Sequence, residues 1–172
     1  MNSDRFRNRS IAYTSWQLTL LVLLRVTIGW HLLYEGIAKL INPDWSSIGF
    51  LLDSQGFLSE FFYSLANNPG ILNVVDFLNI WGLILIGTGL MLGFFTRIAT
   101  IAGMVLLGFY YLSHPPFVGL TFVVPGEGNY LIVNKNLIEF FSLAVLLVFP
   151  TGRIIGLDRF FSRLNPVNRQ KR

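Results

Sequence analysis

The sequence predicts an all-α integral membrane protein, a four-helix bundle whose two termini lie in the cytoplasm. The first observation is composition: 53% of the 172 residues are hydrophobic and only 13% are charged. Soluble domains carry about 25% charged residues and cannot bury this much apolar surface in so small a core. The second observation is that the apolar residues gather in four long runs. A soluble enzyme and a disordered chain are therefore disfavoured.

Four segments are expected to cross the membrane within a single domain that covers residues 1–172. They are residues 16–40, 74–95, 98–113 and 131–149, followed by a basic tail over 150–172. A helix needs about 20 mainly apolar residues to cross a hydrocarbon layer of about 30 Å. The first segment is longer than the apolar part of a cleaved signal and carries Arg25, so we expect it to remain in the mature protein.

The orientation is predicted from the basic residues, which concentrate on the cytoplasmic side of membrane proteins. Ten of the 13 lysines and arginines precede the first span, follow the fourth or lie in the turn between the second and third. They are Arg5, Arg7, Arg9, Arg97, Arg153, Arg159, Arg163, Arg169, Lys171 and Arg172. The two long loops, at 42–73 and 114–130, should therefore face outward.

The first outer loop contains its own helical pattern. Its apolar residues recur at helical spacing: Phe57, Leu58, Phe61, Phe62 and Leu65. This pattern is typical of a helix that lies in the membrane interface, and equally of one that caps the ends of the bundle. We expect the basic tail to rest on anionic lipid.

Small residues predict where the spans pack, because close helix association in lipid depends on them. Span two carries Gly82, Gly87, Gly89 and Gly93, and span three carries Ala99, Gly103 and Gly108. A two-residue turn at Thr96 and Arg97 should make these two spans antiparallel neighbours.

Several functions are excluded or disfavoured by composition. The chain has no cysteine, which excludes disulfides, thiolate metal sites, cysteine-ligated iron–sulfur clusters and CxxC relays. We expect no metal site, because the chain has only two histidines and no pair of Glu-x-x-His repeats. A haem between His31 and His114 is disfavoured since His114 precedes two prolines outside the bundle. Nucleic acid is not an expected partner because the positive charge is confined to the chain ends.

Ionisable residues inside the spans are the main functional signal, since each costs about 2.5–3.5 kcal/mol on insertion. His31, Glu35 and Lys39 recur every fourth residue, on the same third of the first helix as Arg25. Lys135 and Glu139 share a face of the fourth span in the same way. We expect these faces to meet in a polar cleft between spans one and four that opens toward the outer leaflet.

The depth of each charged residue in the membrane predicts which residues form pairs within this cleft. Arg25 and Glu139 lie at the same height, about 14 Å above the inner boundary, and should form an ion pair. Three alternatives remain open. Lys39 extends to the interface, Glu35 and Lys39 form an ordinary helix pair, or the pair of Arg25 with Glu139 only fixes the helix register.

Three stretches resemble the DoxX family of small four-span proteins, and within it the DoxD-type membrane subunits of thiosulfate:quinone oxidoreductases. They are LLRVTIGWHLLYEGIAKL (23–40), GLILIGTGLMLGFFTRIATIAGMVLL (82–107) and NKNLIEFFSLAVLLVFPTGRIIGLDR (134–159). The first span of the family typically reads Arg…Gly…His-Gly-x-x-Lys. Here Glu35 stands where the histidine is usual, and His31 lies one turn earlier.

The resemblance implies electron transfer from an outside reductant to the membrane quinone pool, in the cytoplasmic (inner) membrane of a bacterium. Glu35, Glu139 and His31 would then be the catalytic residues that relay protons. The residues expected to bind the quinone are Arg25, Trp30, Tyr34, Lys39, Lys135 and Asn136. Trp30 and Tyr34 would form the walls of an apolar slot for the head group.

The expected partners are membrane lipids, a periplasmic redox protein and further copies of this chain in a homo-oligomer. An alternative function is a non-catalytic membrane anchor or assembly partner of a redox complex. A transporter is disfavoured because the sequence has neither inverted repeats nor broken mid-helices.

Overall fold

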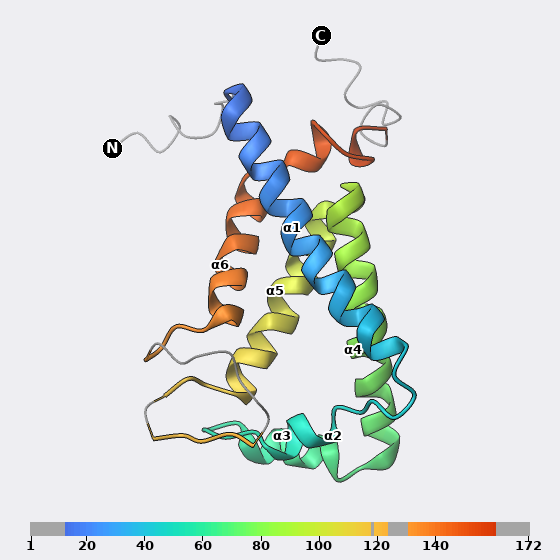
Figure 1. The fold of residues 1–172 in the computed structure, drawn as a ribbon, viewed down its shortest axis with the longest axis vertical. Helices are drawn as coiled ribbons and strands as arrows, with labels where there is room; N and C mark the ends of the chain where they lie inside the picture. Colours follow the sequence, from blue (N-terminus) through green and yellow to red (C-terminus); the bar gives the residue numbers. More distant parts are fainter. Residues whose placement is uncertain (1–12, 118, 124–130, 161–172) are drawn as a thin grey trace, which may run out of the picture.

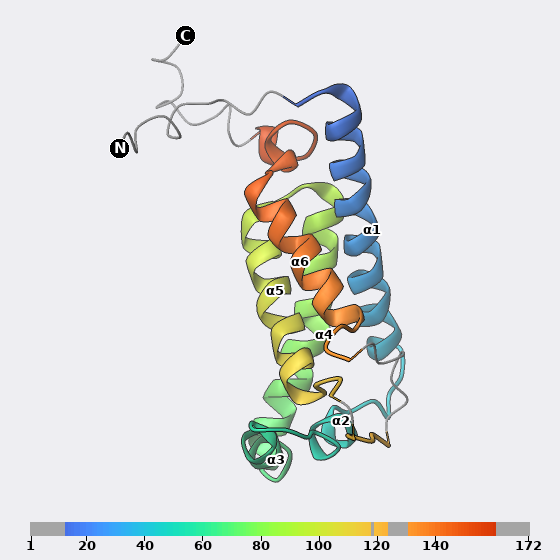
Figure 2. The same ribbon diagram turned by 90° about the vertical axis from the view of Figure 1, so that its left-hand side faces the viewer.

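The computed structural model describes residues 13–117, 119–123 and 131–160. Four long helices run side by side in both views of the ribbon (Figures 1 and 2). They are α1 (Ser15–Leu40), α4 (Pro69–Leu92), α5 (Thr96–Ser113) and α6 (Lys135–Val148). The short helices are α2 (Ile48–Leu52), α3 (Ser59–Ala66) and the 3-10 turn η2 (Thr151–Arg153).

Within the residues that the structure describes, three helices are long and apolar enough to cross a membrane, so the chain is a multi-pass membrane protein. They are α1, α4 and α5, with 26, 24 and 18 residues. Helix α6 has 14 residues, a length of about 21 Å, which is less than the hydrocarbon thickness of about 30 Å. A fourth span at 131–149 therefore stays a prediction.

Capping side chains explain why two helices begin away from the predicted positions. Helix α4 starts at Pro69 instead of residue 74, because Asn68 accepts hydrogen bonds from the backbone N–H groups of Gly70 and Ile71. Helix α6 starts at Lys135 instead of residue 131, because Asn134 accepts from the N–H of Leu137. Apolar composition predicts the middle of a helix well and its first residue poorly.

Glycines bring α1 and α4 into close contact. A Cβ atom on Gly87 would lie 2.4 Å from the backbone N of Leu33 and 2.6 Å from the carbonyl oxygen of Gly29. Gly103 on α5 accommodates Leu143 of α6 in the same way, since a Cβ there would lie 2.9 Å from its Cδ1. The buried core between the four helices is apolar and includes Ile28, Leu32, Leu83, Ile86, Leu90, Leu107, Leu143 and Leu146.

The turn between α4 and α5 makes these helices antiparallel neighbours, as predicted. It lies at residues 93–95, just before the predicted Thr96 and Arg97, and Gly93 and Phe95 both have positive φ, 66° and 46°. A glycine adopts this conformation readily. Residues 150–160 fold back over this turn, and we call this end of the molecule, with Arg97, Arg153 and Arg159, the arginine end.

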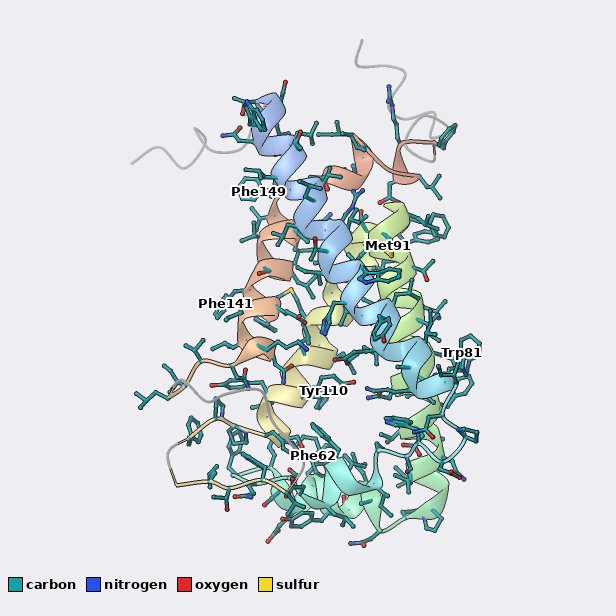
Figure 3. All side chains as sticks on the ribbon, viewed as in Figure 1. Phe62, Trp81, Met91, Tyr110, Phe141 and Phe149 are labelled. Atoms are coloured by element: carbon teal, nitrogen blue, oxygen red, sulfur yellow. The ribbon has the colours of Figure 1, made fainter. Side chains whose placement is uncertain are left out.

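The opposite end, which we call the loop end, is covered by α2, α3 and residues 113–117 and 119–123 (Figure 1). Phe62 and Ala66 of α3 are buried and form a second small core with Leu51, packed against residues of α4 and α5. Phe62 is labelled there in Figure 3. The capping role considered for this helix is confirmed. Phe57 and Phe61 are 81% and 47% exposed beside it, and their contact with a membrane interface stays a prediction.

Candidate functional site

Three ionisable residues of α1 and two of α6 form one continuous set of contacts. His31 Nδ1 lies 3.0 Å from Glu139 Oε1, and His31 Nε2 lies 3.3 Å from Glu35 Oε1. Lys135 Nζ lies 3.7 Å from the same Glu35 oxygen, and Lys39 Nζ lies 3.9 Å from Glu35 Oε2. We call these five residues the polar network. The spacing of four residues on α1 and on α6 places them on facing sides of the two helices.

Helices α4 and α5 extend the polar network toward the loop end. Lys39 Nζ donates to Asn79 Oδ1 at 2.9 Å and to the Tyr110 hydroxyl at 3.4 Å, and Asn79 Nδ2 donates to the same hydroxyl at 2.7 Å. Tyr110 is labelled on α5 in Figure 3. The ammonium group also lies 5.1 Å from the centre of the Trp45 ring. Lys39 therefore points into the bundle and does not extend to the interface.

Asn79 and Tyr110 are functional candidates that the sequence analysis missed. Both lie inside predicted spans, and a buried amide or hydroxyl in a membrane helix needs a hydrogen-bond partner. The signal in the sequence is a polar side chain within the apolar run of a span.

The polar network is open on one side. The side chains of His31, Glu35 and Lys135 are 29%, 35% and 33% exposed, whereas that of Glu139 is 16% exposed. Glu139 Oε2 is buried and has no hydrogen-bond partner in the described residues. The arrangement therefore offers the ammonium donor of Lys135 at its open side, and an unsatisfied carboxyl oxygen of Glu139 lies behind it.

The predicted ion pair between Arg25 and Glu139 is wrong. Arg25 Nη1 donates to Thr151 Oγ1 at 3.0 Å and Nη2 donates to the carbonyl oxygen of Ile155 at 2.8 Å. The segment that follows α6 folds back onto the bundle and supplies these acceptors. Glu139 contacts His31 instead of Arg25. Arg25 is only 4% exposed and lies outside the polar network, so no contact supports the quinone-binding role expected for it.

Asp158 joins this returning segment to the start of α5. Its carboxylate accepts from the backbone N–H groups of Phe95, at 2.7 Å, and Thr96, at 3.0 Å, and from the Thr96 hydroxyl. A carboxylate at a helix N-terminus satisfies free N–H groups and interacts favourably with the helix dipole. A cavity of about 10 Å³, the space of a single water molecule, lies beside Arg25 and Thr151. We interpret this end as a structural clasp.

The remaining predicted binding residues surround the polar network loosely. Trp30 and Tyr34 are 56% and 62% exposed, and their rings contact each other at a centroid distance of 6.3 Å. They lie on the outer surface of α1 and do not enclose a slot. Asn136 is half-buried on the first turn of α6 and takes no part in the contacts described above.

His114, the second histidine, lies in an aromatic stack at the loop end. Its ring stacks on Phe50 at 4.0 Å and contacts Phe122 at 4.6 Å between centroids. Nε2 lies 3.6 Å from Asp53 Oδ2. Burial lowers the pKa of His114 below its ordinary 6.5, and Asp53 opposes this shift.

Acidification should therefore weaken the loop end. Below about pH 6.5 the unfolded chain takes up a proton that folded His114 resists, so stability falls as the pH decreases. Thermal unfolding in detergent at pH 7.5 to 5.5, to be compared with His114→Phe, measures this effect. The variant should lose part of the pH dependence, and an unchanged dependence would show that His114 is not its source.

The fold and the site define an α-helical multi-pass membrane protein with ionisable residues clustered inside its bundle. The DoxX family profile matches residues 20–115, more than half of the chain, and the chain belongs to the DoxX family. The matched range includes His31, Glu35 and Lys39 but ends before α6, which carries Lys135 and Glu139. Comparison with curated proteins and with solved structures gave no match.

Proposed function

We propose that this chain is the membrane subunit of an outward-facing oxidoreductase that passes electrons to the quinone pool. The observation that supports this function is the open side of the polar network. His31, Glu35 and Lys135 are about one third exposed on the flank of a membrane bundle, where charged groups in contact with hydrocarbon are costly. A lipid-soluble molecule with a polar head group would cover them.

The donor set fits a quinone. The ammonium group of Lys135 can donate to a quinone carbonyl, and the exposed rings of Trp30 and Tyr34 provide apolar surface nearby. His31, whose two ring nitrogens face Glu35 and Glu139, would hold these two carboxyl groups in position. Glu139 Oε2 is buried behind the open side, so Glu139 would act through His31 and not by direct contact with the head group. A bound quinone would supply a two-electron, two-proton acceptor. Glu35, His31 and Glu139 would hold the protons in place, and Lys135 would orient the head group.

The electrons would come from outside the chain, because it contains no cysteine and no thiol relay. We place the reductant or its partner protein at the loop end, facing the periplasm. Arg97, Arg153 and Arg159 lie at the other end, in agreement with a cytoplasmic position in the inner membrane of a bacterium. In this arrangement α6, with the flanking residues, is the fourth span.

Quinone binding tests the proposal directly. Protein in lipid nanodiscs, titrated with a soluble ubiquinone analogue, should show quenching of tryptophan fluorescence. Lys135→Met should weaken binding about tenfold, the effect of losing a hydrogen bond to a charged group. His31→Ala should also weaken binding, because the carboxyl groups of Glu35 and Glu139 lose the ring that lies between them.

Ser142→Ala is the matched control, because this exposed α6 hydroxyl only donates to the carbonyl oxygen of Ile138 in its own helix. It should leave the affinity unchanged. Equal affinity in the wild type and in folded His31→Ala and Lys135→Met would rule out the polar network as the quinone site.

A non-catalytic anchor is the second candidate, and the loop end favours it. Phe57, Phe117 and Val123 are 81%, 46% and 90% exposed there, next to the buried face of α3. For an anchor, Phe57→Ser would weaken recruitment of a redox partner, whereas His31→Ala would not.

A further inference from the structure

Both ring nitrogens of His31 face carboxyl oxygens. Nδ1 lies 3.0 Å from Glu139 Oε1 and Nε2 lies 3.3 Å from Glu35 Oε1. A neutral imidazole has one N–H and one nitrogen lone pair, so it can donate to only one of the two. The other nitrogen would direct its lone pair at a carboxylate oxygen.

Both contacts become favourable when the three groups hold one further proton. The proton can make His31 an imidazolium between two carboxylates, or it can protonate Glu35 or Glu139. Either arrangement gives a donor and an acceptor at each of the two contacts. The two short distances therefore favour a proton in the group, whichever atom carries it.

The charged groups around this trio are compatible with such a proton. Lys135 of α6 and Lys39 of α1 both approach Glu35, at 3.7 and 3.9 Å. From α4 and α5 the facing groups are neutral, Asn79 and Tyr110, and they bind Lys39. The positive charges of Lys39 and Lys135 equal the negative charges of Glu35 and Glu139. The net charge of the cluster is therefore zero without the additional proton and +1 with it.

From Glu35, His31 and Glu139, the polar contacts described above continue toward the loop end. Toward the loop end, Glu35 is followed by Lys39, which binds Asn79 at 2.9 Å, and by the Tyr110 hydroxyl. Toward the arginine end, the neighbouring residues of α1 and α6 are buried and apolar. They are Ile28, Leu143 and Leu146, at most 6% exposed.

We propose that Glu35, His31 and Glu139 share one exchangeable proton, and that this proton exchanges with water at the loop end and not at the arginine end. The proposal deepens the proposed function, because protons for quinone reduction would then come from the loop side. It concerns the chain without a quinone, so its test and the quinone titration can fail separately.

Infrared spectroscopy tests the shared proton. Difference spectra of the quinone-free protein at two pH values should contain a carboxyl or imidazolium band that disappears in Glu35→Gln, Glu139→Gln and His31→Gln. Glu60→Gln is the matched control, because this acid is exposed on α3, and it should keep the band. Difference spectra that are the same in wild type and in any folded network variant would overturn the shared proton.

Cysteine labelling tests the direction of access, and the natural chain has no cysteine to interfere. A membrane-impermeant thiol reagent is added to one face of vesicles at a time. Asn79→Cys should react from the loop side, and Leu143→Cys from neither side. The exposed positions in Asp44→Cys and Arg153→Cys identify the two faces. Reaction of Leu143→Cys from the arginine side, or none of Asn79→Cys from the loop side, would overturn the sidedness.

Discussion

Gly87→Ala is expected to destabilise the protein by about 3 kcal/mol, because an added methyl group has no space between α1 and α4. It would lie 2.4 Å from the N of Leu33 and 2.6 Å from the carbonyl oxygen of Gly29. Both neighbours are backbone atoms, so no side chain can rotate away and the helices must separate. The gain of about 1 kcal/mol in helix propensity is too small to offset this cost.

Gly82→Ala is the matched control, on the same helix five residues earlier. A Cβ atom there meets no heavy atom within 4 Å, so the variant should be as stable as the wild type or up to about 1 kcal/mol more stable. Thermal unfolding of both variants in the same detergent compares them. If Gly87→Ala melts together with Gly82→Ala, the close approach of α1 and α4 is incorrect.

The separation should also disturb the polar network. His31 lies on α1 between Gly29 and Gly36, the two glycines that contact α4. A shift of α1 away from α4 changes the 3.0 Å contact of His31 with Glu139 on α6. We therefore expect the pH-dependent infrared band to weaken in Gly87→Ala at temperatures where the protein is still folded.

Helical periodicity predicted the composition of the polar network well. Residues four apart share a helix face regardless of the rest of the fold, so His31, Glu35 and Lys39 could be placed together from the sequence. The same reasoning placed Lys135 with Glu139. Their meeting across α1 and α6 required only that the two charged faces avoid lipid.

The partner of Arg25 could not be predicted in this way. Arg25 and Glu139 were paired because they lie at the same distance from the inner membrane boundary. This reasoning does not include a segment that leaves the bundle after α6 and folds back onto it. Residues 150–160 looked like a basic tail, and their acceptors, the Thr151 hydroxyl and the Ile155 carbonyl, carry no charge. Every residue has a backbone carbonyl oxygen, so the sequence does not show which one accepts a hydrogen bond. The ion pair was therefore predicted wrongly.

The arginine end supplies a second large effect, the loss of Asp158. Asp158→Ala removes the acceptor for the N–H groups of Phe95 and Thr96 and for the Thr96 hydroxyl. We expect a loss of about 2–3 kcal/mol, as for a charged helix cap with several donors. Asp158→Asn keeps one acceptor oxygen and should lose about 1 kcal/mol. Asp44→Ala, an exposed acid at the loop end, should have no effect on the unfolding temperature.

A double variant with Arg25 shows whether Asp158 fixes the returning segment or only caps α5. Arg25 holds Thr151 and Ile155, and Asp158 holds the start of α5, so both residues fix the same returning segment. When either residue is replaced, the segment detaches in part and the contacts of the other residue contribute less to stability. The double variant Arg25→Met with Asp158→Ala should therefore lose less stability than the sum of the two single losses. Trypsin should also cleave after Arg153 and Arg159 faster in each single variant, because the detached segment becomes accessible. Additive losses with unchanged cleavage would mean that Asp158 only caps α5 and that the segment is held by other contacts.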